Sequence, residues 1–89
     1  MLYFYIKGCS AGTFMEDDAC VDCPVGQYQD QENQTSCIDC PVGSYQDFTG
    51  QANCISCAEG YMTSHTGASS SDECYFDFCK YKVISYCVL

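Results

Sequence analysis

The sequence predicts a small disulfide-rich fold, in which tandem cysteine-rich repeats form an elongated disulfide ladder with short β-ribbons and little helix. Ten of the 89 residues are cysteine, a density typical of small domains stapled by disulfides. Three Cys-x-x-Cys pairs recur at a constant spacing. The segments between them are rich in Gly, Ser, Gln, Asn and Asp and lack helical periodicity, so turns and two-stranded ribbons are expected.

The apolar content is too small for a conventional core. Between Cys9 and Cys74 only nine residues are Val, Ile, Leu, Met or Phe. Chains of this size rarely obtain enough stability from one hydrophobic core, and natural mini-proteins add disulfides. Because cross-links restrict the unfolded chain, we expect disulfides to supply the missing stability. An even number of cysteines permits complete pairing, which requires an oxidising compartment.

The repeat is the strongest signal in the sequence. Each Cys-x-x-Cys pair begins 17 residues after the previous one, and the three pairs are Cys20/Cys23, Cys37/Cys40 and Cys54/Cys57. Residues 20–36 and 37–53 are identical at ten of 17 positions. This identity indicates duplication and a quasi-linear architecture in which each repeat contacts its neighbours.

The spacing divides the chain into an extension, four repeats and a tail. We assign residues 1–8 to the N-terminal extension, 9–22, 23–39, 40–56 and 57–74 to the repeats, and 75–89 to a divergent C-terminal tail. The tail is dominated by aromatic and β-branched residues, and a strand pair and an unnatural read-through terminus both fit it. The apolar stretch at the N-terminus is shorter than the apolar region of a signal sequence, so we expect a fragment of a larger surface protein or an incomplete gene model, whose targeting sequence lies upstream, with an unconventional start as the alternative.

A turn followed by an aromatic residue recurs after the second cysteine of each pair. The residues of this motif are Pro24, Gly26, Tyr28, Pro41, Gly43, Tyr45 and Gly60. The glycines stand where the chain must reverse after a bridged cysteine, so a positive φ is expected there. The tyrosine rings are expected to cover the neighbouring disulfide and strand, and contact with a ligand is their alternative role.

The repeat also predicts the disulfide pairing. A bridge within Cys-x-x-Cys would form a tight, easily reduced ring and leave the repeats unstapled, so the two cysteines are expected to reach in opposite directions. The predicted pairs are Cys9–Cys20, Cys23–Cys37, Cys40–Cys54 and Cys57–Cys74, with Cys79–Cys87 by elimination. The alternative places Cys20 opposite Cys37 and Cys23 opposite Cys40.

Zinc is the chemical alternative to disulfides. The spacing of the first two Cys-x-x-Cys pairs falls within that of a four-thiolate zinc site. A third pair in the same phase would then be left over, and Cys9 and Cys74 would have no role. We therefore expect no metal and no cofactor, and keep an intracellular zinc-binding adaptor as the second hypothesis.

No other residue pattern predicts chemistry. Four aspartates within or near the Cys pairs, Asp22, Asp30, Asp39 and Asp47, offer carboxylates to Ca²⁺, but they lack EF-hand spacing. His65 is the only histidine and has no neighbouring nucleophile or carboxylate pattern. We therefore predict a protein that is not an enzyme and has no catalytic residues.

The charge restricts the partners. Twelve acidic residues against three basic ones give a formal charge of −9, which opposes binding to nucleic acid or to anionic lipid. No apolar run is long enough to span a membrane, so this segment is not expected to insert into one. The sequence Asn33-Gln34-Thr35 is an acceptor for N-glycosylation, which makes Asn33 a candidate for modification.

The motif from Cys20 to Tyr28, and again from Cys37 to Tyr45, resembles the ephrin-receptor-like cysteine-rich repeat, whose hallmark is Cys-x-x-Cys-Pro-x-Gly-x-Tyr. The resemblance covers roughly Cys9 to Cys74 and is weaker in the last repeat. It implies a module similar to those of growth-factor and tumour-necrosis-factor receptors: a non-catalytic part of a secreted protein or ectodomain. Such a module spaces domains or binds a protein ligand or neighbouring domains of its own chain. A secreted cystine-rich inhibitor or toxin is a further alternative, although such proteins usually lack a tandem period.

Overall fold

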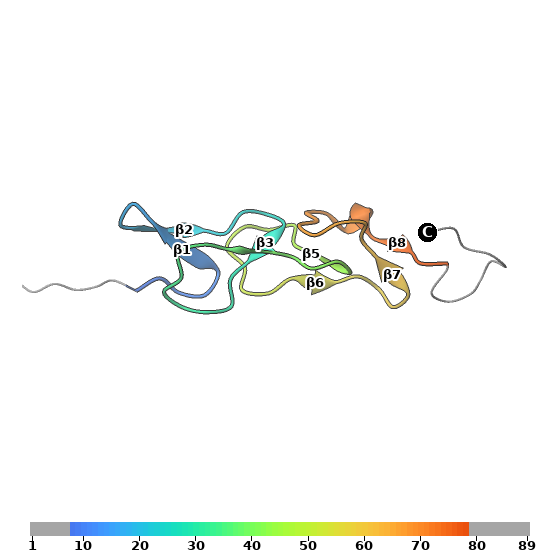
Figure 1. The fold of residues 1–89 in the computed structure, drawn as a ribbon, viewed down its shortest axis with the longest axis horizontal. Coiled ribbons are helices and arrows are strands. Elements are labelled where there is room, and N and C mark those ends of the chain that lie inside the picture. The colour runs from blue at the N-terminus through green and yellow to red at the C-terminus, as the bar shows by residue number, and fades with distance from the viewer. Residues whose placement is uncertain (1–7, 79–89) are drawn as a thin grey trace, which may run out of the picture.

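The structure is a computed structural model, and it describes residues 8–78. These residues form an elongated rod with the chain running from one end to the other (Figure 1). Apart from one 3-10 turn, the regular structure consists of eight short strands, so the small disulfide-rich fold class with short β-ribbons and little helix is confirmed. Within the described residues, no helix has the length and apolar content needed to cross a membrane.

Each repeat forms one antiparallel two-stranded sheet. The pairs are β1 (Thr13–Glu16) with β2 (Ala19–Asp22), β3 (Gln27–Tyr28) with β4 (Ile38–Asp39), β5 (Ser44–Tyr45) with β6 (Ile55–Ser56), and β7 (Tyr61–Met62) with β8 (Tyr75–Phe76). The 3-10 turn η1 (Ser71–Glu73) lies in the fourth repeat, between β7 and β8. Isolated hairpins of two residues per strand are not stable alone, so other contacts must hold them.

A tight turn starts each hairpin. The amide of Gln27 donates to the carbonyl of Pro24 over 3.2 Å, and the amide of Ser44 donates to that of Pro41 over 3.1 Å. The third residue of each turn has a positive φ, 82° at Gly26 and 96° at Gly43, which glycine adopts at low cost. Gly60 follows the same pattern, with a φ of 88°.

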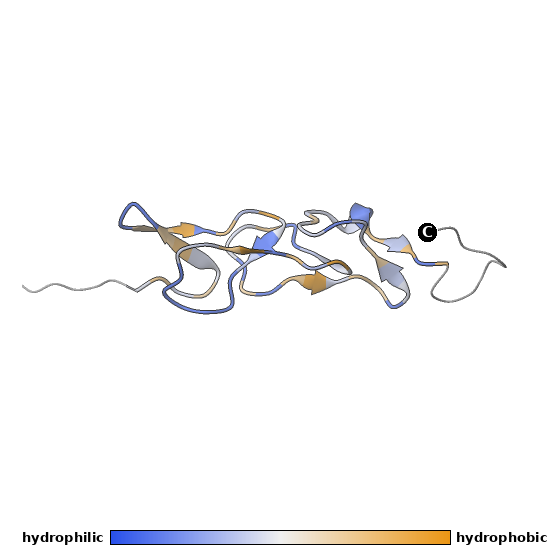
Figure 2. Cartoon of the chain, viewed as in Figure 1, coloured by the Kyte–Doolittle hydropathy of each residue, from blue (hydrophilic) through white to orange (hydrophobic). Residues whose placement is uncertain are grey.

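Cystine takes the place of an apolar core. Among the described residues, the buried hydrophobic residues are Cys9, Cys23, Cys40 and Ala68. Figure 2 shows hydrophobic residues in short, scattered stretches of the ribbon and not along one continuous face. The chain therefore stacks its disulfides along the rod, as expected when nine apolar residues cannot close a core.

Backbone hydrogen bonds join each repeat to the next at equivalent positions. The amide of Gly12 donates to the carbonyl of Gln29 over 2.7 Å, and the amide of Gly26 donates to that of Gln46 over 2.8 Å. The loop of the following repeat returns a bond to the first cysteine of the preceding one. These bonds run from Asn33 to Cys9 (2.7 Å), from Gly50 to Cys23 (2.8 Å) and from Gly67 to Cys40 (2.8 Å). The repeats thus form one continuous ladder.

The hairpin of the fourth repeat includes two residues after Cys74. β8 pairs with β7, although we assigned Tyr75 and Phe76 to the tail. The amide of Asp77 donates to the carbonyl of Gly60 over 2.8 Å, as the amide of Cys57 does to Gly43. Asp77 therefore occupies the position of the second cysteine of a pair. The rest of the predicted tail, including Cys79 and Cys87, lies outside the described residues.

Candidate functional site

Four disulfides hold the described residues together. They join Cys9 to Cys20, Cys23 to Cys37, Cys40 to Cys54 and Cys57 to Cys74, with Cα separations of 5.5, 5.8, 5.8 and 5.9 Å. These separations lie within the range that disulfides permit. The four pairs are those that the repeat predicts, and the alternative that pairs Cys20 with Cys37 is not formed. The predicted pair Cys79–Cys87 lies outside the described residues.

This pairing bears on the zinc hypothesis. The four thiolates of the proposed site, Cys20, Cys23, Cys37 and Cys40, are each bonded to another sulfur. Residues 8–78 contain no group of three or more His, Cys, Asp or Glu side chains placed to hold a metal ion. In this structure the Cys-x-x-Cys pairs are therefore structural links between repeats.

The candidate calcium ligands lie apart, along the rod. The carboxylate of Asp22, in the first repeat, lies beside Gly50 of the third repeat. Asp39 accepts a hydrogen bond of 2.9 Å from the side-chain amide of Gln27 across the hairpin. Asp30 and Asp47 are both exposed, and each follows a buried glutamine. Asp22 and Asp39 are equivalent positions in successive repeats, and so are Asp30 and Asp47.

The motif tyrosines are half-buried and face the strand on the other side of their hairpin. Tyr28 pairs with Ile38, and Tyr45 pairs with Ile55. Tyr45 also lines a shallow hollow together with Cys57 and Cys74, so its ring lies near the disulfide of the following repeat. This position of Tyr45 is compatible with the expected covering role, and ligand contact stays the alternative prediction.

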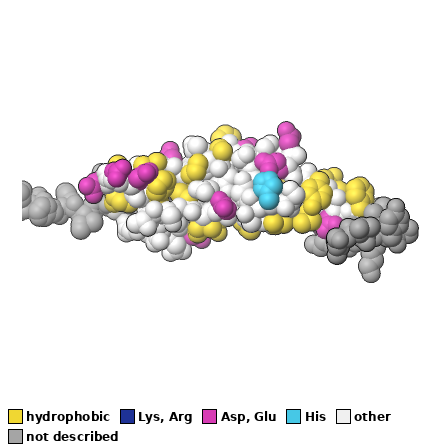
Figure 3. Space-filling model, turned by 45° about the horizontal axis from the view of Figure 1, so that its top comes forward, with side chains coloured by type: hydrophobic (Ala, Val, Ile, Leu, Met, Phe, Trp, Pro, Cys, Tyr) yellow, Lys and Arg dark blue, Asp and Glu magenta, His cyan; other side chains and the backbone are white. Residues whose placement is uncertain are grey.

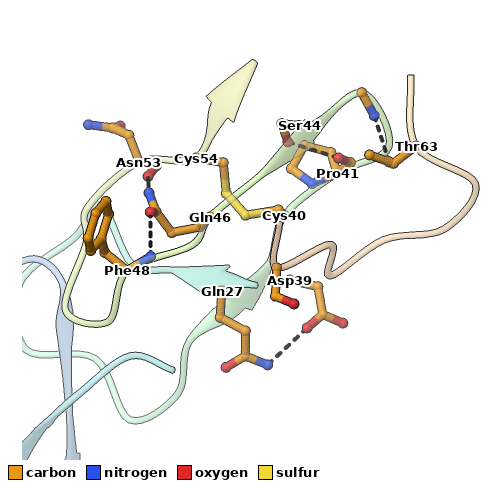
Figure 4. Close-up of a disulfide and its surroundings, with 12 residues drawn as sticks. Gln27, Asp39, Cys40, Pro41, Ser44, Gln46, Phe48, Asn53, Cys54 and Thr63 are labelled. Atoms are coloured by element: carbon orange, nitrogen blue, oxygen red, sulfur yellow. Dashed lines mark hydrogen bonds between the residues drawn. A yellow bond between two sulfur atoms is a disulfide. The ribbon is translucent and has the colours of Figure 1, made fainter. Parts of the chain in front are cut away.

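A buried glutamine follows each motif tyrosine, and its role was not predicted from the sequence. Gln46 is 2% exposed and closes its loop by two hydrogen bonds, shown in Figure 4. Its amide nitrogen donates to the carbonyl of Asn53 over 2.7 Å, and its amide oxygen accepts from the backbone of Phe48 over 3.0 Å. Gln29 makes the equivalent bonds in the second repeat. The only signal in the sequence is the identity of these residues between repeats.

Thr63 takes the glutamine position in the fourth repeat. Its side chain is fully buried, and its hydroxyl accepts a hydrogen bond of 3.1 Å from the amide of Gly43. The same hydroxyl donates to the carbonyl of His65 over 3.1 Å. A shorter side chain thus keeps the link to the preceding repeat while the loop beyond it changes.

His65 contributes to that altered loop. Its Nε2 lies 3.1 Å from a carboxylate oxygen of Glu73, and its Nδ1 lies 2.7 Å from the carbonyl of Thr66. The other oxygen of Glu73 accepts from the backbone of Ser69 over 2.9 Å. With the His65 side chain 59% exposed, this arrangement holds a surface loop. No free thiol lies beside it, since the described cysteines are all in disulfides.

The surface of the rod combines exposed apolar residues with a single sign of charge. The first residue after the last cysteine of each repeat is exposed, as in Val21, Ile38, Ile55 and Tyr75. Val25, Val42 and Phe48 are exposed at the turns and loops, with Phe48 reaching 64%. All twelve acidic residues of the chain lie within residues 8–78, whereas its three lysines, Lys7, Lys80 and Lys82, lie outside them. On the face that Figure 3 shows, acidic side chains lie at several places along the rod.

Comparison with known proteins identifies the repeat. The model of the family described as tyrosine-protein kinase ephrin type A/B receptor-like matches residues 8–43 and 31–74, which together span most of the described rod. A search of curated proteins finds no match. The matched residues include all four disulfides and the turn motifs between them.

Proposed function

Because the chain belongs to the family of ephrin type A/B receptor-like cysteine-rich repeats, we propose that it is a non-catalytic extracellular module that spaces neighbouring domains and presents a surface to a protein partner. The observation that carries this proposal is the disulfide ladder. Four disulfides in 71 described residues need an oxidising environment, since cytosolic thiols are kept reduced.

The spacer role is supported by the way in which the repeats are joined. Each junction shares a Cys-x-x-Cys segment whose two cysteines bond in opposite directions, and hydrogen bonds between backbones cross the same junction. A rod linked in this manner resists bending more than a chain of domains joined by flexible linkers. It would hold two flanking domains at a fixed distance.

The binding role is supported by the composition of the surface. Exposed apolar side chains such as Val42 and Phe48 are of the type that fills the centre of protein interfaces. The acidic side chains around them favour a partner with a basic surface and oppose anionic polymers. We propose a protein ligand of this kind, or neighbouring domains of the same chain.

The test is the location and thiol content of the native protein. Material isolated from the source cells is separated into extracellular or surface-accessible and intracellular fractions, and its free thiols are counted under denaturing conditions. The proposal expects the protein in the extracellular fraction with no reactive thiol among the eight cysteines of residues 9–74. Intracellular protein with free thiols and bound zinc would overturn it and favour the adaptor hypothesis.

A further inference from the structure

Asn33 has a left-handed backbone conformation, and the residues at the equivalent positions of the third and fourth repeats, which share this conformation, are glycines. Its φ is 61°, and the corresponding values are 71° at Gly50 and 81° at Gly67. Asparagine tolerates this left-handed region better than most residues. Two hydrogen bonds fix it to Cys9: its backbone amide donates to the Cys9 carbonyl over 2.7 Å, and its Oδ1 accepts from the Cys9 amide over 2.9 Å.

The two ends of the Asn33 amide have different surroundings. Oδ1 faces the first repeat, whereas no hydrogen bond to Nδ2 occurs within residues 8–78. Asn33, Gln34 and Thr35 are all exposed. The nitrogen is therefore available on the surface while the oxygen serves the fold.

The loop of the second repeat also differs from those of the later repeats in what lies beside it. In the third and fourth repeats the carbonyls of Gly50 and Gly67 pack against Gly12 and Gly26, each two repeats earlier. Asn33 belongs to the second repeat, so the described residues contain no repeat two places before it. A Cβ on Gly50 would lie 3.1 Å from the carboxylate carbon of Asp22, and one on Gly67 would lie 3.6 Å from that of Asp39, whereas no such earlier repeat lies beside Asn33 within the described residues.

We propose that Asn33 carries an N-linked glycan attached through Nδ2, and this inference rests on the extracellular function proposed above. The sequence Asn33-Gln34-Thr35 meets the acceptor rule, and the chain's other asparagine, Asn53, is followed by Cys54 and Ile55 and does not. The donor is a lipid-pyrophosphate-linked oligosaccharide. The bond from its anomeric carbon to the pyrophosphate oxygen breaks as the bond to Nδ2 forms, the amide loses one proton, and the lipid pyrophosphate leaves.

The modification is compatible with the structural role of Asn33. A glycosylated asparagine keeps its carbonyl oxygen, so Oδ1 continues to accept from the Cys9 amide. The glycan would cover the surface beside the junction of the first two repeats. A protein partner would then have access chiefly to the later repeats, of which the third carries the exposed Val42 and Phe48.

The test combines native protein with variants of the full chain secreted from eukaryotic cells. The intact mass is measured before and after treatment with a glycosidase that releases N-glycans and leaves aspartate at position 33. Thr35→Ala removes the acceptor sequence without touching the contacts to Cys9, Thr35→Ser retains it, and Asn33→Gly supplies the residue that Gly50 and Gly67 provide. A glycan mass that the enzyme removes is expected for the native protein, the unaltered secreted chain and Thr35→Ser, and is lost in the other two.

The outcomes separate this inference from the function on which it rests. Native extracellular protein with paired cysteines and an unmodified Asn33 overturns the glycan and leaves the proposed function standing. Native protein with free thiols overturns both. A glycan that persists in Thr35→Ala would place the modification elsewhere and also overturn the inference.

Discussion

The carbonyl oxygen of Gly50 lies where a side chain on Gly12 would begin: a Cβ built on Gly12 falls 2.5 Å from it. The same relationship holds between Gly26 and the carbonyl of Gly67. Gly12 and Gly26 are thus each covered by the loop of the repeat two places later. Gly43 has no such neighbour within 4 Å, since the described residues end with the fourth repeat.

Gly12→Ala therefore tests the contact with Gly50, and Gly43→Ala is its control, because only Gly12 has this backbone neighbour. Both positions have similar positive φ values, 90° and 96°, so both variants carry the same backbone strain. Gly12→Ala adds a collision with backbone, and overpacking of this kind costs about 1–3 kcal/mol. We expect Gly12→Ala to lower the free energy of unfolding by that additional amount in denaturant titrations with the disulfides intact. Equal losses in the two variants would contradict the contact between alternate repeats.

The buried glutamine gives a second prediction. Gln46→Ala leaves the amide of Phe48 and the carbonyl of Asn53 without the partners that Gln46 supplies. A buried group left without a partner costs about 1–3 kcal/mol. Because Phe48 and Asn53 are exposed and water replaces part of the lost bonding, a total loss of about 1–3 kcal/mol is expected in the free energy of unfolding. The control is Gln27→Ala, which removes a solvent-exposed bond to Asp39 and should cost less than about 1 kcal/mol. Similar losses in both variants would show that burial at position 46 has no effect.

The ladder and its turns could be predicted from the sequence because they repeat every 17 residues. A bond between Cys23 and Cys37 has an equivalent in Cys40–Cys54, so the period alone restricts the pairing. The contact of Gly12 with Gly50 could not be predicted, because it depends on the rise and rotation of successive repeats. The part played by Tyr75 and Phe76 in the last hairpin could not be predicted, because Asp77 stands where the period would show a cysteine.

The source of stability gives a third prediction. The buried positions that would hold an apolar core are occupied by Cys9, Cys23 and Cys40, all in disulfides. Reduction should therefore unfold residues 8–78, whereas a metal chelator under oxidising conditions should leave them folded. Circular dichroism and the protection of backbone amides from exchange measure how much structure remains after each treatment. Loss of structure on chelation alone would favour zinc over the ladder.

The last prediction concerns amide exchange along the rod. The amides of Gly12 and Gly26 donate to carbonyls of the following repeat over 2.7 and 2.8 Å, and the amide of Gly43 donates to the Thr63 hydroxyl over 3.1 Å. The amide of Gly60, at the same position of the fourth repeat, has no acceptor within residues 8–78.

Because an amide without an intramolecular acceptor exchanges with solvent more readily, Gly60 should exchange faster than Gly12 and Gly26 under native conditions. The Thr63 amide should likewise exchange faster than that of Gln46, which donates to the carbonyl of Ala68 over 3.0 Å. Exchange measured by nuclear magnetic resonance on the oxidised protein resolves these amides individually. If Gly60 were protected as strongly as Gly26, an acceptor outside residues 8–78 would have to cover the end of the fourth repeat, and the rod would not end there.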